Sequence, residues 1–203
     1  MNLENRPDKI MDAVIIGVSD RSSLWRHGSI KKEDYDNFVN EYAVFLNKHF
    51  DNLIVVPDEG VYTDIAIEFS KLKGRKATAY YPDKDTNYGY EYLKPLFDKF
   101  EVHPIEGDWY KLGAELTKKS LTIICLGFSP GVLIEISYIK YHQKFSGEKK
   151  PQLKNIHLFI DERCVEQRLP KTFEEQIKNI YYYTNFDDLE KLIGKSEDIR
   201  IYD

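Results

Sequence analysis

Cysteine is scarce in this sequence. Its two cysteines, Cys125 and Cys164, stand in apolar or mixed surroundings, and no metal-ligand spacing surrounds either of them. We therefore expect reduced thiols in a cytosolic protein rather than a disulfide framework. The five histidines are scattered along the chain without a pairing rule, so no metal site is predicted.

Long hydrophobic runs and excess positive charge are also missing. No apolar run approaches the ~20 residues that span a membrane. Residues 1–13 are polar and lack the apolar centre of a signal peptide. The net charge of −5 and the few short lysine runs argue against a nucleic-acid surface, which needs clustered Lys and Arg. These features predict a cytoplasmic protein without a membrane or nucleic-acid partner.

The sequence contains enough hydrophobic residues to form a core. Hydrophobic residues make up 42% of the 203 positions, and no stretch has the composition of a linker, a repeat or a low-complexity tract. We expect a single domain over residues 1–203, in which residues 1–11 form a loose arm or an added short strand.

Apolar runs alternate with segments of helical periodicity along the chain. Strands are expected at 13–18, 52–56, 76–81, 101–105, 121–126, 156–160 and 180–183. Helices are expected at 32–50, 61–72, 88–100, 108–119, 131–145, 173–177 and 186–193. This alternation predicts an α/β, Rossmann-like, doubly wound fold, with a mostly parallel sheet of about six or seven strands and helices on both faces. The run 101–105 contains Glu, His and Pro, which fit an edge strand.

The stretch 121–136, LTIICLGFSPGVLIEI, is the centre of the predicted fold. Its apolar run reads as a strand buried on both faces. Gly127 ends that run, Ser129 can cap a helix, and Pro130 fits the first helical turn. Gly131 has no side chain to cover the backbone. Free amide donors would therefore be exposed at the positive end of the helix dipole. Glu135 follows within two turns and can reach over that position.

In a parallel sheet the turns after the strands gather at one edge, where ligands bind at the reversal of strand order. The candidate ligand- or phosphate-binding residues at these turns are Gly17, Ser19, Arg21, Ser22, Ser23, Gly60, Thr63, Gly127, Ser129 and Gly131. The alternative interpretation is that the small residues only make tight connections. Arg21 would then serve a surface ion pair. Among the aromatic residues, Tyr62 and Trp109 fall near these predicted turns.

Three segments resemble the LOG (lysine decarboxylase-like) family of Rossmann-type proteins, across roughly residues 12–195. They are VIIGVSDRSS, LIVVPDEGVYTDIAIEF and LGFSPGVLIE. In the last segment, Leu126, Gly131, Leu133 and Glu135 fall on positions of the family's LPGGxGTxxE signature. The chain departs from the family at its paired glycines, and no arginine stands near Lys111, where the family has an Arg-Lys pair. The resemblance implies a nucleotide or nucleoside-phosphate ligand, no further cofactor, and a homodimer formed through helices beside the site.

Two functions remain open from the sequence. The first is an enzyme that cleaves a ribosyl N-glycosidic bond, with Glu135 as the catalytic carboxylate and Asp64 as a second candidate. Asp58 and Glu59 would repel a phosphate at the same edge, or bind a ribose diol. The second is a nucleotide-sensing or carrier domain that has lost the chemistry. In that case Glu135 is an acid favoured by the helix dipole.

Overall fold

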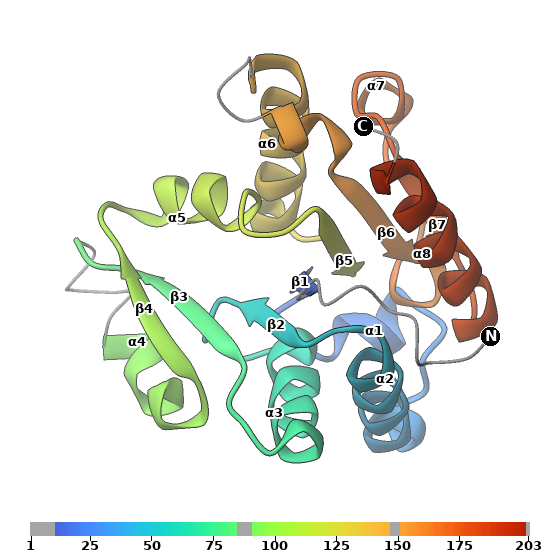
Figure 1. Ribbon diagram of the computed structural model, residues 1–203. Coiled ribbons are helices and arrows are strands. Elements are labelled where there is room, and N and C mark those ends of the chain that lie inside the picture. Colours follow the sequence, from blue (N-terminus) through green and yellow to red (C-terminus); the bar gives the residue numbers. More distant parts are fainter. Residues whose placement is uncertain (1–10, 85–90, 147–150, 202–203) are drawn as a thin grey trace.

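A computed structural model describes residues 11–84, 91–146 and 151–201. Its strands form one parallel sheet of seven strands in the order β4-β3-β2-β1-β5-β6-β7 (Figure 1). The strands are β1 (Asp12–Gly17), β2 (Asn52–Val55), β3 (Thr78–Pro82), β4 (Glu101–Ile105), β5 (Thr122–Leu126), β6 (His157–Asp161) and β7 (Ile180–Tyr183). The predicted fold class is confirmed, including the edge position of 101–105.

The centre of the sheet is built from continuous apolar runs. Every residue of β5 and of β6 is buried, as expected for strands covered by helices on both faces. β1 lies between β2 and β5, with Gly17 opposite Leu126. The strand order therefore changes direction at β1 and β5, and the turns that follow these two strands lie side by side at the carboxyl edge of the sheet.

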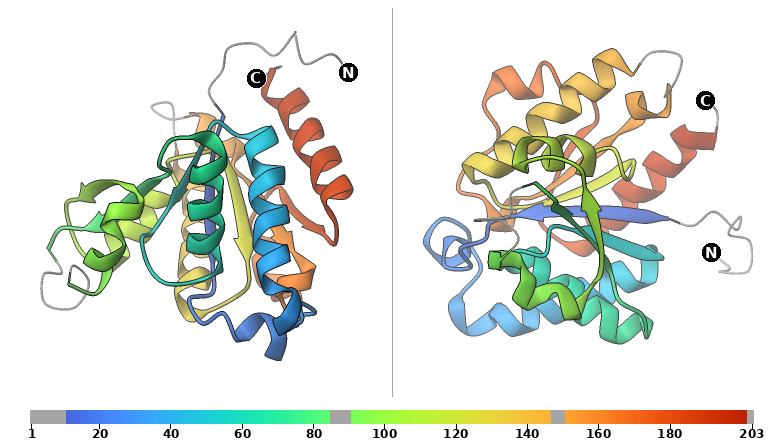
Figure 2. Two further views of the ribbon diagram at one scale, coloured as in Figure 1. Left: turned by 90° about the horizontal axis from the view of Figure 1, so that it is seen from below. Right: turned by 90° about the vertical axis from the view of Figure 1, so that its left-hand side faces the viewer.

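Helices form a layer on each face of the sheet. The longer helices are α2 (Tyr35–His49), α3 (Val61–Lys73), α5 (Trp109–Leu116), α6 (Pro130–Phe145) and α8 (Phe186–Ile201). Side chains of α2, α3 and α8 share one apolar core, and side chains of α5 and α6 share the other. The right-hand view of Figure 2 shows α5 and α6 on one side of β1 and α2 and α3 on the other.

Short helical segments complete the described chain. They are α1 (Ser23–Arg26), α4 (Glu91–Leu93) and α7 (Lys171–Glu174), with 3₁₀ helices at Lys32–Asp34, Lys94–Lys99, Pro151–Asn155 and Glu162–Cys164. The predicted helix 88–100 starts outside the described residues and continues as α4 and a 3₁₀ helix, in whose first turn Pro95 lies. The closing helix extends to Ile201, beyond the predicted end at residue 193.

A buried polar cluster joins β6 and β7 to α2. Asp161, at the end of β6, accepts a hydrogen bond of 2.5 Å from the Tyr42 hydroxyl, which also contacts the Tyr183 hydroxyl. The Arg163 guanidinium donates to the same carboxylate at 2.7 Å and lies over the rings of Tyr42 and Phe186. The cluster satisfies a carboxylate that has no solvent exposure, as a buried charge requires.

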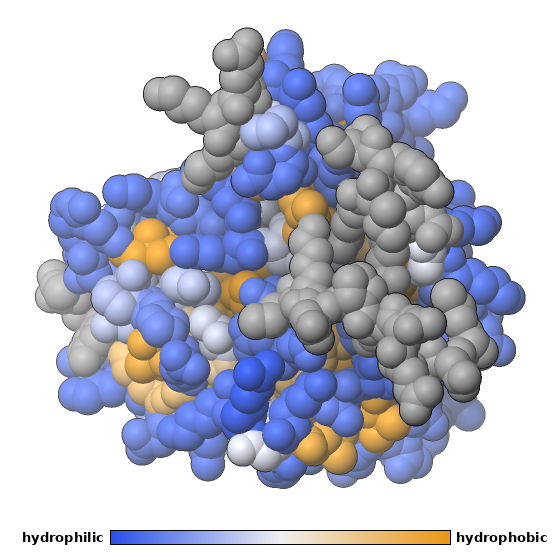
Figure 3. All heavy atoms as spheres, viewed as in Figure 1, coloured by the Kyte–Doolittle hydropathy of each residue, from blue (hydrophilic) through white to orange (hydrophobic). Residues whose placement is uncertain are grey.

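The face seen in Figure 3 is mostly hydrophilic, with hydrophobic side chains in a few separate groups. Among the described residues, no helix has the length and apolar character needed to cross a membrane.

Candidate functional site

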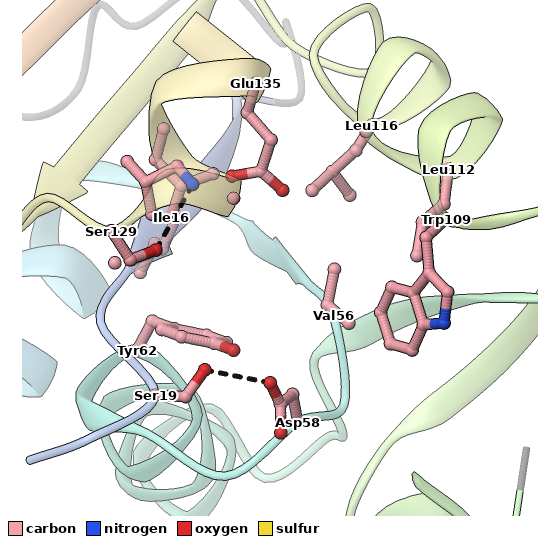
Figure 4. A pocket seen from close by; sticks show the side chains of 15 residues that line it. Ile16, Ser19, Val56, Asp58, Tyr62, Trp109, Leu112, Leu116, Ser129 and Glu135 are labelled. Atoms are coloured by element: carbon pink, nitrogen blue, oxygen red, sulfur yellow. Dashed lines mark hydrogen bonds between the residues drawn. The ribbon is translucent and has the colours of Figure 1, made fainter. Parts of the chain in front are cut away.

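A cavity of about 140 Å³ lies where the strand order reverses. Its floor comes from the end of β1 and the residues after it, including Ile16, Gly17 and Ser19. Val56 and Asp58, which follow β2, form one side, and α3 adds Tyr62. The opposite side is made by α5 and the first turns of α6. In Figure 4, Glu135 and Asp58 approach the space from opposite sides.

The start of α6 follows from its sequence. The Ser129 side chain accepts a hydrogen bond from the Val132 amide at 3.3 Å, and the Ser129 carbonyl accepts one from the Leu133 amide at 2.9 Å. Pro130 occupies the first helical position and has no amide hydrogen. Gly131 is the second residue of the helix, so its amide has no acceptor within the helix. This one amide is the donor that α6 leaves at the cavity.

Glu135 lies one and a half turns into α6 and lines the cavity. Its side chain packs over Gly113 of α5, where an added Cβ would lie 3.4 Å from the Glu135 Cγ. Leu112, Leu116 and Trp109 of α5 form the apolar wall beside it (Figure 4). Burial in these surroundings raises the pKa of Glu135 to about 7. The carboxyl group therefore gains and loses its proton near neutral pH, well above the range of an exposed glutamate.

Asp58 is the second carboxylate of the cavity. Its Oδ2 accepts a hydrogen bond of 2.9 Å from the Ser19 hydroxyl (Figure 4), and its backbone carbonyl accepts one from the Thr63 hydroxyl. Oδ1 is buried and has no hydrogen-bond partner among the described residues. The Tyr62 hydroxyl points into the same space, and burial, with a smaller effect of the Asp58 charge, holds its pKa well above the usual range. The unpaired Asp58 oxygen is an acceptor available to a ligand.

The loop after β1 uses its own polar groups internally. The Asp20 carboxylate accepts hydrogen bonds from the Ser22 amide at 3.0 Å and the Ser22 hydroxyl at 2.7 Å, and it contacts Arg26. Arg21 donates two hydrogen bonds, of 2.5 and 2.8 Å, to Asp64. These hydrogen bonds raise the pKa of Arg21, so it stays charged and paired.

Residues predicted to bind a ligand divide into two groups. Those that line the cavity are Gly17, Ser19, Ser129, Gly131 and Glu135. Those outside its lining are Arg21, Ser22, Ser23, Gly60, Thr63 and Gly127.

Two glycines of the second group are required by the backbone. Gly60 has a φ of 150° and Gly127 a φ of 110°, which other residues rarely adopt. An added Cβ at Gly60 would lie 2.7 Å from the Val18 carbonyl oxygen, and one at Gly127 would lie 2.9 Å from the Val18 Cγ1. Both glycines therefore have a role in packing the turns, whatever the ligand.

Of the residues that α5 contributes to the cavity, the sequence indicated only Trp109. Leu112, Gly113 and Leu116 line the cavity, although their apolar spacing indicated only a helix packed on a sheet. The one available signal was Gly113 inside a helix, because a glycine there often marks close packing. Within the described ranges, no group of three or more His, Cys, Asp or Glu side chains is placed to hold a metal ion.

No protein-family model and no curated protein sequence matches this chain. Solved structures match it at the level of the fold. A Moco carrier protein from Chlamydomonas reinhardtii has 14% identity and a TM-score of 0.54, over 92% of this chain and 99% of the other. A molybdenum cofactor binding protein from Rippkaea orientalis has 13% identity and a TM-score of 0.53, over 93% and 98%.

DNA processing protein A from Helicobacter pylori, described as binding single-stranded DNA, has 14% identity and a TM-score of 0.53, over 93% of this chain and 82% of that one. At these identities the similarity shows a shared Rossmann-type fold.

Proposed function

We propose that the cavity at the ends of β1 and β5 binds a nucleoside or nucleotide, as in LOG-like Rossmann-type proteins. The observation that carries this proposal is the pair of carboxyl groups, Asp58 and Glu135, on opposite sides of one cavity at the reversal of strand order. Ligands of doubly wound sheets bind at this position. The cavity combines apolar walls with a few convergent polar groups, which is the usual composition of a small-molecule site.

The size of the cavity limits what enters it. Pockets for drug-sized ligands measure ~300–1,000 Å³, whereas this one has about 140 Å³. One ring, either the ribose or the base, fits inside, and the remainder of the ligand lies at the mouth. Asp58 Oδ1 and the Tyr62 hydroxyl suit the hydroxyl groups of a ribose, because a carboxylate oxygen accepts hydrogen bonds and a phenol both donates and accepts them.

If the protein is an enzyme, Glu135 is the group that moves a proton. A carboxyl group with a pKa of about 7 is close to the optimum for general acid catalysis near neutral pH. In N-glycosidic hydrolysis, water adds to C1′ of the ribose and the bond from C1′ to the base nitrogen breaks. The base leaves with the proton of Glu135, and a proton of the attacking water restores the acid. The Asp58 carboxylate stabilises the cationic sugar of the transition state.

The alternative is a carrier or sensing protein that binds the ligand without turnover. Two observations favour it. Arg21, the described arginine that the sequence places at this edge, is paired with Asp64 and is not available to a ligand. The similar structures also include proteins described as a cofactor carrier and a cofactor binding protein.

One experiment separates these possibilities. The protein is mixed with a panel of nucleosides and nucleoside monophosphates. Binding is followed by isothermal titration calorimetry, and free base is measured by chromatography. Base release that Glu135→Gln abolishes supports the enzyme, and binding without release supports the carrier.

A variant of Asp58 and a control variant outside the cavity test whether binding uses the cavity. Asp58→Asn is expected to weaken binding at least about tenfold, since it removes the charge and leaves one acceptor oxygen where the carboxylate has two. Glu68→Gln is the matched control because Glu68 lies on α3, pairs with Lys71 and does not line the cavity. If no member of the panel binds, or if the two variants behave alike, the proposal is wrong.

We also propose a homodimer formed through α6 and a cytoplasmic location. Ile134, Tyr141 and Phe145 are exposed on α6, which flanks the cavity, and exposed apolar side chains gathered on one helix are typical of an interface. The two buried free thiols fit a reducing compartment. Light scattering tests the first proposal, and a monomer at micromolar concentration would rule out this dimer.

A further inference from the structure

We propose that the site is selective for the unphosphorylated nucleoside over the corresponding nucleotide. This inference rests on the proposed function, because it concerns the ligand of the same cavity. Four features of the described residues support it: the donors of the β1 loop, the start of α6, the charges at the mouth, and the acceptors inside the cavity.

Several polar groups of the β1 loop, namely the Ser19 and Ser22 hydroxyls, the Ser22 amide and the Arg21 side chain, are already paired within the chain. Asp20 occupies the Ser22 amide and hydroxyl, and the Ser19 hydroxyl donates to Asp58. Asp64 occupies two nitrogen atoms of Arg21 and also accepts a hydrogen bond from Tyr35. In sites that bind phosphate, groups of these kinds point at the anion. Here the carboxylates of the chain itself take that place.

The start of α6 offers little in compensation. Pro130 has no amide hydrogen, and the Val132 amide is held by the Ser129 side chain. A single amide, that of Gly131, is left at the first turn. Phosphate-binding loops surround the anion with several amides, so one amide at this helix does not make such a cradle.

The described charged side chains of the elements beside the cavity include several carboxylates. Asp20, Asp58 and Glu59 lie on the loops after β1 and β2, and Asp64 lies in the first turn of α3, whereas Arg21 and Arg26 are both already paired with carboxylates. Glu59 is 68% exposed and reaches only the edge of Arg21, at 3.9 Å. A nucleoside monophosphate brings about −1.5 to −2 charges at pH 7. Its phosphate would therefore meet these carboxylates, while the described arginines of the β1 loop and α1 are already paired.

Inside the cavity, acceptors dominate and a donating ligand is favoured. Asp58 Oδ1 is buried and unpaired, and Glu135 presents a second carboxyl group across from it. Ribose hydroxyls and the amino groups of a base donate hydrogen bonds to such groups, whereas phosphate oxygens at neutral pH mainly accept them. The chemistry of the cavity and that of its mouth thus favour the same ligand class, a neutral molecule rich in hydroxyl groups.

The test compares matched pairs of ligands, adenosine with AMP and guanosine with GMP, by calorimetry at about 0.15 M and 0.5 M NaCl. We expect each nucleoside to bind at least about tenfold more tightly than its monophosphate. The difference should shrink at high salt, because salt screens repulsion at the exposed mouth. If the monophosphates bind equally well or better, the inference fails while the proposed function stands. If neither member of a pair binds, the proposed function fails.

Two variants test the physical cause. Glu59→Gln removes an exposed charge, and Asp64→Asn frees Arg21 while keeping an acceptor for Tyr35. Both are expected to strengthen AMP binding about threefold or more and to leave adenosine binding within twofold. Glu68→Gln, on the same helix as Asp64, should change neither. The electrostatic explanation is overturned if all three variants change the affinity for AMP equally. It is also overturned if neither Glu59→Gln nor Asp64→Asn changes that affinity.

Discussion

Replacing Glu135 by glutamine should stabilise the protein at alkaline pH. The cavity raises the pKa of this carboxyl group from 4.5 to about 7. Because the folded state binds the proton more tightly than the unfolded state, Glu135 contributes stability below pH 4.5. That contribution is lost as the pH rises towards 7 and above. A glutamine of the same shape has no proton to lose, so the variant avoids this loss.

The magnitude follows from the two pKa values. A change from 4.5 to about 7 corresponds to about 3 kcal/mol at pH 8, an upper value since part of the side chain reaches the surface. At pH 5 the same arithmetic leaves less than about 1 kcal/mol. For a chain of this size, the pH 8 difference raises the melting temperature by about 6–12 °C.

The assay is urea unfolding of the wild type and Glu135→Gln at pH 5 and pH 8. Glu175→Gln serves as the control because Glu175 is exposed on the surface, and its effect should be small at both pH values. The reasoning is refuted if the difference between Glu135→Gln and the wild type is the same at pH 5 and pH 8. A destabilised variant at pH 8 would show that an ionised Glu135 has a partner in the folded protein.

Three further predictions concern the fold. Gly127→Ala should destabilise the protein by about 1–3 kcal/mol in urea unfolding, because φ is 110° there; Gly194→Ala, where an added Cβ meets nothing within 4 Å, should be neutral or stabilising. Tyr42→Phe should cost about 1–3 kcal/mol, because it removes a donor from the buried Asp161 carboxylate; an unchanged urea midpoint would contradict this. Burial raises the pKa of Cys125, so its thiol should react with a disulfide reagent only after unfolding, and rapid reaction in the native protein would count against it.

The sheet was predictable because its interior strands and its edge strand differ in amino-acid composition. β5 and β6 have apolar centres, are buried throughout and lie at the interior of the sheet, and the charged and proline-bearing β4 lies at its edge. Helix spacing and short connections then determine the topology. Strand and helix ends moved by a few residues, because the last turn of an element depends on its tertiary contacts.

The site was predictable only in part. Ser19, Ser129 and Glu135 follow strands and were found for that reason, since the ends of parallel strands meet. The pairing of Arg21 with Asp64 joins residues that are 43 positions apart, and no local pattern indicates it. The apolar wall from α5 likewise depends on how closely Gly113 lets two helices approach.

The order of the strands has a consequence for synthesis of the chain. β2, β3 and β4 each add beside the strand made just before, so the first half of the sheet can assemble as the chain grows. β5 then returns to the opposite side of β1. Until β5 is made, one margin of β1 is unpaired, and four of the residues of this strand, Ala13 to Ile16, are apolar. Such a strand edge can recruit other chains. A ribosome that stalls between residues 105 and 122 would therefore carry an aggregation-prone intermediate, and a chaperone that covers this margin would be needed most at that length.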